Sequence, residues 1–121
     1  MDAGTGADIR PSDEQAVAVA YDAEEQRFVA SVPGSSEVAF LSVVPSATIW
    51  AFVHTEVPEA LNGKGVGGEL VSWALNYVRE RGLKVRPTCR FVSAYLRRHP
   101  AELDVVHPRY RRSFEKKAGD Q

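Results

Sequence analysis

The strongest constraint on the fold is a change of hydrophobic period at a run of glycines. From residue 16 to residue 57, apolar and β-branched residues come in short segments separated by turn residues, which is typical of β-strands. From residue 66 to residue 81, apolar residues recur at steps of three and four, the spacing of a helix that buries one face. Between them, four of the six residues 63–68 are glycine, so a turn almost free of side chains joins sheet to helix.

Four strands are expected before the glycines, at residues 16–21, 27–32, 37–44 and 48–57. The connections between them are short and hold turn residues such as Pro33 and Gly34, which favours antiparallel hairpins. The helix over 66–81 is followed by a short strand over 83–85, so these elements form a βαβ unit whose outer strands should be parallel. A second helix is expected over 91–99, and residues 101–106 should add a last turn or strand.

These elements predict an α+β fold. It has a mainly antiparallel sheet, a central long helix, a βαβ unit and a second short helix after the last strand. The chain has 121 residues, 44% of them hydrophobic and 26% charged, which suits one globular domain. We expect residues 1–14 to be a disordered N-terminal segment, residues 15–107 to form the domain, and residues 108–121 to be a basic C-terminal tail.

Composition argues against several classes of function. The formal net charge is −1 and the core has no basic stripe, so nucleic acid is not an expected partner. The apolar runs fall well short of the ~20 residues that cross a bilayer, and the N-terminus has no apolar signal segment, so no membrane partner is expected. The single cysteine, Cys89, cannot form an internal disulfide or a cysteine-rich zinc site. We therefore expect a cytoplasmic protein without a bound metal.

The glycine run has the properties of an anion site. The first amide groups of a helix have no partner within the helix and carry the positive end of its dipole, and glycine lets a ligand approach them closely. The alternative is a loose loop whose glycines only pack the helix start against the sheet. The run is not a P-loop, because Lys64 is followed by Gly65 and not by serine or threonine.

The same segment resembles the acyl-CoA pyrophosphate loop of the GNAT acetyltransferases, whose form is Arg/Gln-x-x-Gly-x-Gly/Ala. In this chain the loop is Asn62-Gly63-Lys64-Gly65-Val66-Gly67. Four further segments follow the order of the minimal single-domain GNAT-like proteins: residues 54–58, 82–85, 87–89 and 94–100. Asn62 departs from the pattern, which removes one side-chain contact to the pyrophosphate but leaves the backbone amides.

The resemblance implies an acetyl-CoA-dependent N-acetyltransferase that uses acetyl-CoA as co-substrate and acetylates an unidentified amine, either a metabolite or a protein. It places the pantetheine arm against the main chain of Val57. The pyrophosphate would contact the loop residues Asn62, Gly63, Lys64, Gly65, Val66, Gly67 and Gly68. Lys84, Arg97 and Arg98 can meet the 3′-phosphate, and the alternative for Arg97 and Arg98 is a solvated face of the helix. The alternative is a CoA-binding sensor or scaffold of the same fold that does not turn over.

Two residues of the strand over 48–57 can act as bases. Alternate side chains of a regular strand share a face, so His54 and Glu56 should lie together on the face of Trp50 and Phe52 and meet one cavity. Glu56 can deprotonate an amine directly or through water, and a histidine such as His54 can exchange a proton near neutral pH. The alternative is that both only fix the strand end by hydrogen bonds.

Cys89 and Tyr95 complete the candidate set. Cys89 precedes the second helix and is followed by Arg90, and both features stabilise a thiolate that can accept the acyl group. The resemblance implies the same role for Cys89, and the alternative is an inert buried thiol. The resemblance also makes Tyr95 the donor of a proton to the departing CoA sulfur, against the alternative of a core aromatic residue.

Overall fold

The computed structural model describes residues 16–119, and the side chains of residues 16–114. The segment 1–14, which we expected to be disordered, lies outside the described residues. The strands are β1 (Ala18–Asp22), β2 (Arg27–Ser31), β3 (Val38–Val44), β4 (Ile49–Glu56) and β5 (Lys84–Pro87). The helices are α2 (Val66–Glu80), α3 (Arg90–Arg98) and α4 (Pro108–Gly119), with short 3-10 turns η2 (Glu59–Leu61) and η3 (Pro100–Val105).

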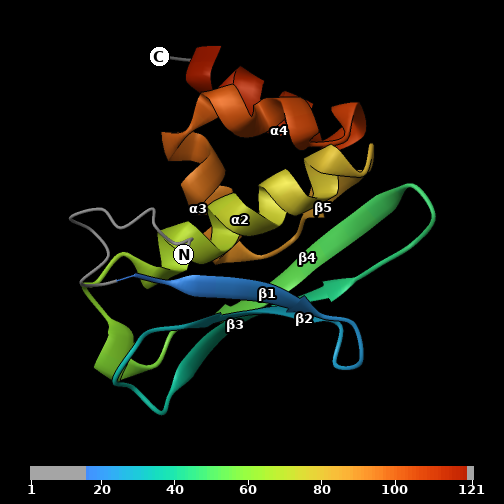
Figure 1. The fold of residues 1–121 in the computed structure, drawn as a ribbon. Coiled ribbons are helices and arrows are strands. Elements are labelled where there is room, and N and C mark those ends of the chain that lie inside the picture. The colour runs from blue at the N-terminus through green and yellow to red at the C-terminus, as the bar shows by residue number, and fades with distance from the viewer. Residues whose placement is uncertain (1–15, 120–121) are drawn as a thin grey trace, which may run out of the picture.

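The strands form one sheet in the order β1-β2-β3-β4-β5. Neighbouring strands are antiparallel from β1 to β4, and β5 lies parallel to β4. The helices α2, α3 and α4 gather on one side of the sheet (Figure 1). The predicted α+β class, with its antiparallel sheet, long helix and βαβ unit, is confirmed.

The core lies between the sheet and α2. The helix turns its apolar stripe toward the strands, as its period of three and four predicts. From the sheet, the fully buried side chains include Phe28, Ala30, Ala39, Leu41 and Phe52, and from α2 they include Leu70, Val71, Ala74, Leu75 and Val78. Burial of this apolar surface is the main term that holds α2 on the sheet.

A β-bulge interrupts the pairing of β3 with β4. Val43 pairs with Phe52, but the preceding residue Ser42 pairs with His54, so Val53 is an extra residue in β4. An extra residue reverses the alternation of side chains beyond it. Thr55, which pairs with the buried Leu41, therefore faces the helices.

The bulge corrects one expectation. We predicted that His54 and Glu56 share the face of Trp50 and Phe52, and this is wrong. Trp50 and Phe52 point toward α2, as the ring contact of Trp50 with Tyr77 shows. His54 and Glu56 lie beyond the bulge and point to the other side of the sheet, although they still share one face with each other.

The pairing of β4 with β5 is short. It runs from Ile49 opposite Lys84 to Phe52 opposite Pro87. The last contact is at Thr88, whose backbone N–H and side-chain hydroxyl both donate to the Phe52 carbonyl, at 3.2 Å and 3.1 Å. Beyond this point β4 continues alone while the chain turns into α3, so the two strands part.

The C-terminal residues pack on the domain. Residues 101–106, expected as a turn or strand, form most of η3, and Val106 bridges to Val85. Of the residues expected as a basic tail, Pro108–Gly119 form α4, in which Phe114 is buried and the Arg111 guanidinium donates to the Val106 carbonyl at 2.9 Å; residues 120–121 lie outside the described residues. No helix within residues 16–119 is long and apolar enough to cross a membrane.

A forked ion pair ties the end of α2 to η3. The Arg79 guanidinium donates two hydrogen bonds to the Asp104 carboxylate, at 2.7 Å and 2.8 Å, and a third to Glu102 at 2.7 Å. Hydrogen bonding to Arg79 lowers the pKa of Asp104, although partial burial opposes the shift. A lowered pKa means that the carboxylate stabilises the fold above its ordinary pKa of ~3.9, and that this stabilisation is lost as pH falls through the lower folded-state value.

We predict that Asp104→Asn lowers the free energy of unfolding at pH 7 by about 1 kcal/mol or less, because the Asp104 side chain is 56% exposed and its charge is screened. The difference from the wild type should shrink as pH falls below ~4 and through the lowered folded-state pKa of Asp104. Urea unfolding between pH 2 and pH 7 measures it, with Glu80→Gln on the exposed face of α2 as the control. An equal loss at all pH values would show that the ion pair is not the cause.

Candidate functional site

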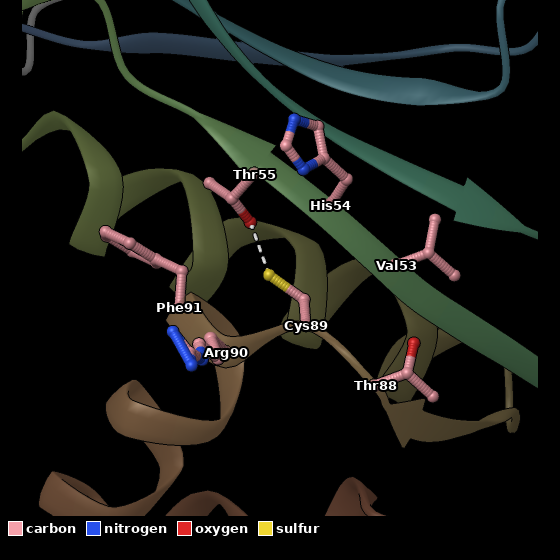
Figure 2. Close-up of a pocket in the computed structure, with 7 residues that line it drawn as sticks. All are labelled: Val53, His54, Thr55, Thr88, Cys89, Arg90 and Phe91. Atoms are coloured by element: carbon pink, nitrogen blue, oxygen red, sulfur yellow. Dashed lines mark hydrogen bonds between the residues drawn. The ribbon is translucent and has the colours of Figure 1, made fainter.

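A cavity of about 530 Å³ lies where β4 parts from β5 (Figure 2). One wall is the bulged end of β4 and the other is the turn from β5 into α3. The residues that line it are Val53, His54, Thr55, Thr88, Cys89, Arg90 and Phe91. The two predicted site residues His54 and Cys89, 35 positions apart in the sequence, therefore meet at one cavity.

Cys89 is the residue immediately before α3, at its N-cap position, and it lines the cavity. Its side chain is only 7% exposed, and its Sγ lies 3.2 Å from the Thr55 hydroxyl, toward which it points in Figure 2. The hydrogen bond fixes the sulfur opposite the inward-facing end of β4. Thr55 is a site residue that the sequence analysis missed, because only the bulge turns its side chain toward Cys89.

His54 and Glu56 form a pair on the other side of β4. The His54 Nε2 lies 3.0 Å from the Glu56 Oε2, and the two side chains are 57% and 60% exposed. Figure 2 shows the imidazole on the side of β4 opposite Cys89. His54 lines the rim of the cavity and Glu56 does not. The structure thus brings the two candidate bases together but separates them from Cys89 by the strand itself.

Tyr95 lies outside this cavity. It is 6% exposed, and its ring stacks on His99 with centroids 4.0 Å apart. It lines a second groove of about 310 Å³ between the start of α2 and the side of α3. The other residues of this groove, which we call the donor groove, are Gly65, Gly68, Glu69, Ser72, Arg98 and His99. Tyr95 therefore faces the glycine turn.

The glycine turn leaves the first amides of α2 without partners. Gly63 and Gly65 have φ angles of +80° and +75°, a left-handed conformation that other residues rarely adopt. No side chain caps the helix, and the first hydrogen bond to Gly65 comes from Glu69. Within the described part of the chain, nothing accepts from the N–H groups of Val66, Gly67 or Gly68. Three adjacent donors at the positive end of a helix are suited to an anion.

Two glycines of the turn serve different purposes. A Cβ added at Gly67 would lie 2.4 Å from Cζ of the Phe91 ring, so glycine there lets α3 pack on α2. A Cβ at Gly68 would meet only Tyr95, at 4.0 Å, and Gly68 lines the donor groove. The packing alternative that we weighed for the glycines therefore applies to Gly67 and not to Gly68.

The expected 3′-phosphate ligands do not converge. The Lys84 ammonium donates to the Asp104 carbonyl at 3.0 Å, at the end of α2 opposite to the glycine turn. Arg98 lines the donor groove, whereas Arg97 lines a different groove on the opposite side of α3.

We predict opposite effects for two neighbouring substitutions. Gly67→Ala must displace the Phe91 ring and should lower the free energy of unfolding by about 1–3 kcal/mol. Gly68→Ala meets no obstacle and should leave it unchanged or raise it by up to about 1 kcal/mol, because alanine is the better helix former. Urea unfolding of both variants measures this. Equal destabilisation would contradict the packing of α3 on Gly67.

The residues that match known proteins include the strands and helices that form these sites. Residues 27–105 match the sequence model of a family described as GCN5-related N-acetyl-transferase. Protein NATD1 of Gallus gallus is 31% identical over 92 residues, which is 75% of this chain and 84% of the relative. NATD1 of Danio rerio is 31% identical over 94 residues, covering 76% and 79%. NATD1 of Homo sapiens is 31% identical over 85 residues, covering 69% and 75%. The matched span runs from the start of β2 to the end of η3 and includes the cavity and the glycine turn.

Proposed function

Because the chain belongs to the GCN5-related N-acetyltransferase family, we propose that it transfers the acetyl group of acetyl-CoA to an amine. The observation that carries this proposal is that a helix start with free amides lies beside a cavity that holds a thiol. Phe91 joins the two, since its ring lines the cavity and packs on Gly67. An acyl donor with a diphosphate at one end and a thioester at the other would place the diphosphate at the start of α2 and the thioester in the cavity.

In this proposal the diphosphate accepts hydrogen bonds from the free amides of Val66, Gly67 and Gly68, with the flanking Asn62, Gly63, Lys64 and Gly65 around it. The pantetheine arm follows the main chain of Val57, at the exposed edge that β4 leaves beyond its pairing with β5. Arg98 faces the nucleotide end from the donor groove. Glu69 lines the same groove and opposes an anion there, so the amides and Arg98 must outweigh it.

The cavity supports a two-step transfer through Cys89. The Cys89 sulfur attacks the thioester carbon, the bond from that carbon to the CoA sulfur breaks, and the proton of the Cys89 thiol ends on the CoA sulfur. The amides of Arg90, Phe91 and Val92 at the start of α3 have no acceptor among the described residues, so they can stabilise the oxyanion. Thr55 holds the sulfur in place.

Tyr95 keeps the role that the resemblance gives it: its hydroxyl gives a proton to the departing CoA sulfur and regains one from the Cys89 thiol, so that the net transfer is from Cys89 to CoA. It lines the donor groove and lies six residues beyond Cys89 on α3. It therefore acts from the donor's side of the helix, whereas Thr55 and the amides act from the cavity.

The acceptor amine then attacks the acetyl group on Cys89, and the carbon–Sγ bond breaks. One proton of the amine passes to His54 at the rim of the cavity, and solvent water returns a proton to the Cys89 sulfur, because β4 separates the imidazole from it. Glu56 accepts the hydrogen bond of the His54 Nε2–H, which leaves Nδ1 as the basic atom. In this account His54 moves the proton, and Glu56 is a positioning residue that holds the imidazole in the required tautomer.

The anion site is tested by shortening the donor. We predict that acetyl-CoA binds in isothermal titration and that S-acetylpantetheine, which lacks the diphosphate and the nucleotide, binds at least about tenfold more weakly, because charge-assisted hydrogen bonds to the α2 amides are lost. Equal affinity for the two donors would remove the diphosphate site. Acetyl-CoA binding without thiol release against a panel of amines would leave the sensor or scaffold alternative.

The covalent route is tested at Cys89. We predict that incubation with acetyl-CoA adds one acetyl group that hydroxylamine removes, and that Cys89→Ala abolishes both this label and turnover. Thr55→Val should slow labelling several-fold because the sulfur loses its hydrogen-bond partner, while Thr55→Ser, which keeps the hydroxyl, should restore it. Intact-protein mass spectrometry follows the label. A Cys89→Ala variant that turns over at the wild-type rate would show direct attack of the amine on acetyl-CoA.

A further inference from the structure

We propose that a basic groove between α3 and α4 binds acidic side chains of a peptide, and so recruits a peptide acceptor to the Cys89 cavity. That the bound peptide is the acetyl acceptor rests on the proposed function. Binding of the peptide does not, because the groove is separate from the sites that we assign to acetyl-CoA and to the acetyl group.

The groove has a volume of about 410 Å³ and lies against the end of β5. Its lining residues are Pro87 of β5, Ser93 and Arg97 of α3, and Arg109, Tyr110, Ser113 and Phe114 of α4. Arg86 adds a third guanidinium, which lies over the Tyr110 ring with its Cζ 5.4 Å from the ring centroid. The groove therefore combines an apolar floor at Phe114 with guanidinium groups at its rim.

The charge of this groove is not balanced by the described part of the chain. Arg86, Arg97 and Arg109 are exposed. The ion pairs among residues 16–114 belong to His54 and Arg79, and none of them involves these three arginines. A guanidinium presents a planar fork of N–H donors that matches a carboxylate. Two such forks at one groove favour a ligand with more than one acidic group.

The groove and the Cys89 cavity follow one another along one face of α3. Arg90, Ser93 and Arg97 are spaced by three and four residues, so they lie on the same side of the helix. Arg90 lines the Cys89 cavity, whereas Ser93 and Arg97 line the groove. Seven residues of helix rise by about 10 Å, which an extended peptide covers in about three residues. When the amine of an extended peptide lies at Cys89, the peptide residues about three positions from the amine-bearing residue therefore lie in the groove.

This face is distinct from the one that serves the donor. Tyr95 and Arg98 line the donor groove and project from nearly the opposite side of α3, about 150° around the helix axis from Ser93 and Arg97. Acetyl-CoA and an acidic peptide can therefore be bound together. A nucleic acid is not favoured, because the groove is short and the chain has a formal net charge of −1, whereas a phosphate backbone calls for a long basic surface.

The experiment measures binding without acetyl-CoA. The probes are fluorescein-labelled peptides that contain one lysine, with aspartate or glutamate at the third to fifth positions on either side, and matched peptides with asparagine or glutamine there. Fluorescence anisotropy should show the acidic peptides binding at least about tenfold more tightly at low salt. The double variant Arg97→Ala, Arg109→Ala should lose about tenfold in affinity for them. Arg112→Ala, an exposed arginine of α4 that does not line the groove, is the matched control.

A charge exchange makes the test specific. Arg97→Glu with Arg109→Glu should reverse the preference, so that peptides with lysine in place of the acidic residues bind more tightly. Equal binding of acidic and amide peptides, an equal loss in Arg112→Ala, or tighter binding of a single-stranded oligonucleotide of the same charge would overturn the proposal. Because the titration contains no acetyl-CoA, a failure of the transferase would show separately, as absent thiol release with groove binding intact.

Discussion

The parting of β4 from β5 is the constraint on which the site depends. Pro87 has no N–H to continue the ladder, and Thr88 closes it by giving both of its donors to the Phe52 carbonyl. On the other strand, the bulge at Val53 turns Thr55 toward the helices. The end of the β4–β5 pairing and the bulge are both local features. Together they open a cavity at the sheet and place Cys89 against Thr55 within it.

The helix α3 organises the surroundings of that cavity by dividing its faces. Val92 and Leu96 are fully buried and fix the helix to the core. A second face packs Phe91 on Gly67 and turns Tyr95 to the glycine turn, on the side that we assign to the donor. The third face carries Arg90 at the Cys89 cavity and Arg97 at the groove beside α4, on the side that we assign to the acceptor. In our proposal, α3 thus separates acetyl-CoA from the acceptor peptide along most of its length, and the two meet at its first turn.

Periodicity predicted most of the fold, because strands and helices with one buried face show that face in the sequence. The hairpins, α2, and the parallel pairing of β4 with β5 were all predicted. The predictions failed, or were never made, where the structure depends on a single inserted residue or on a contact between distant segments of the chain. A single extra residue, Val53, leaves no periodic signal, so the faces of His54 and Glu56 were assigned wrongly. The contact of Thr55 with Cys89 joins residues 34 positions apart, and only the folded sheet brings them together.

The central claim is that the free amides at the start of α2 bind the diphosphate of acetyl-CoA. The most direct measurement is a titration of the ¹⁵N-labelled protein, followed by the amide signals of Val66, Gly67 and Gly68. We predict that acetyl-CoA moves these three signals most strongly and that S-acetylpantetheine leaves them nearly in place. Unmoved signals at α2, with the large changes elsewhere on the molecule, would contradict the account.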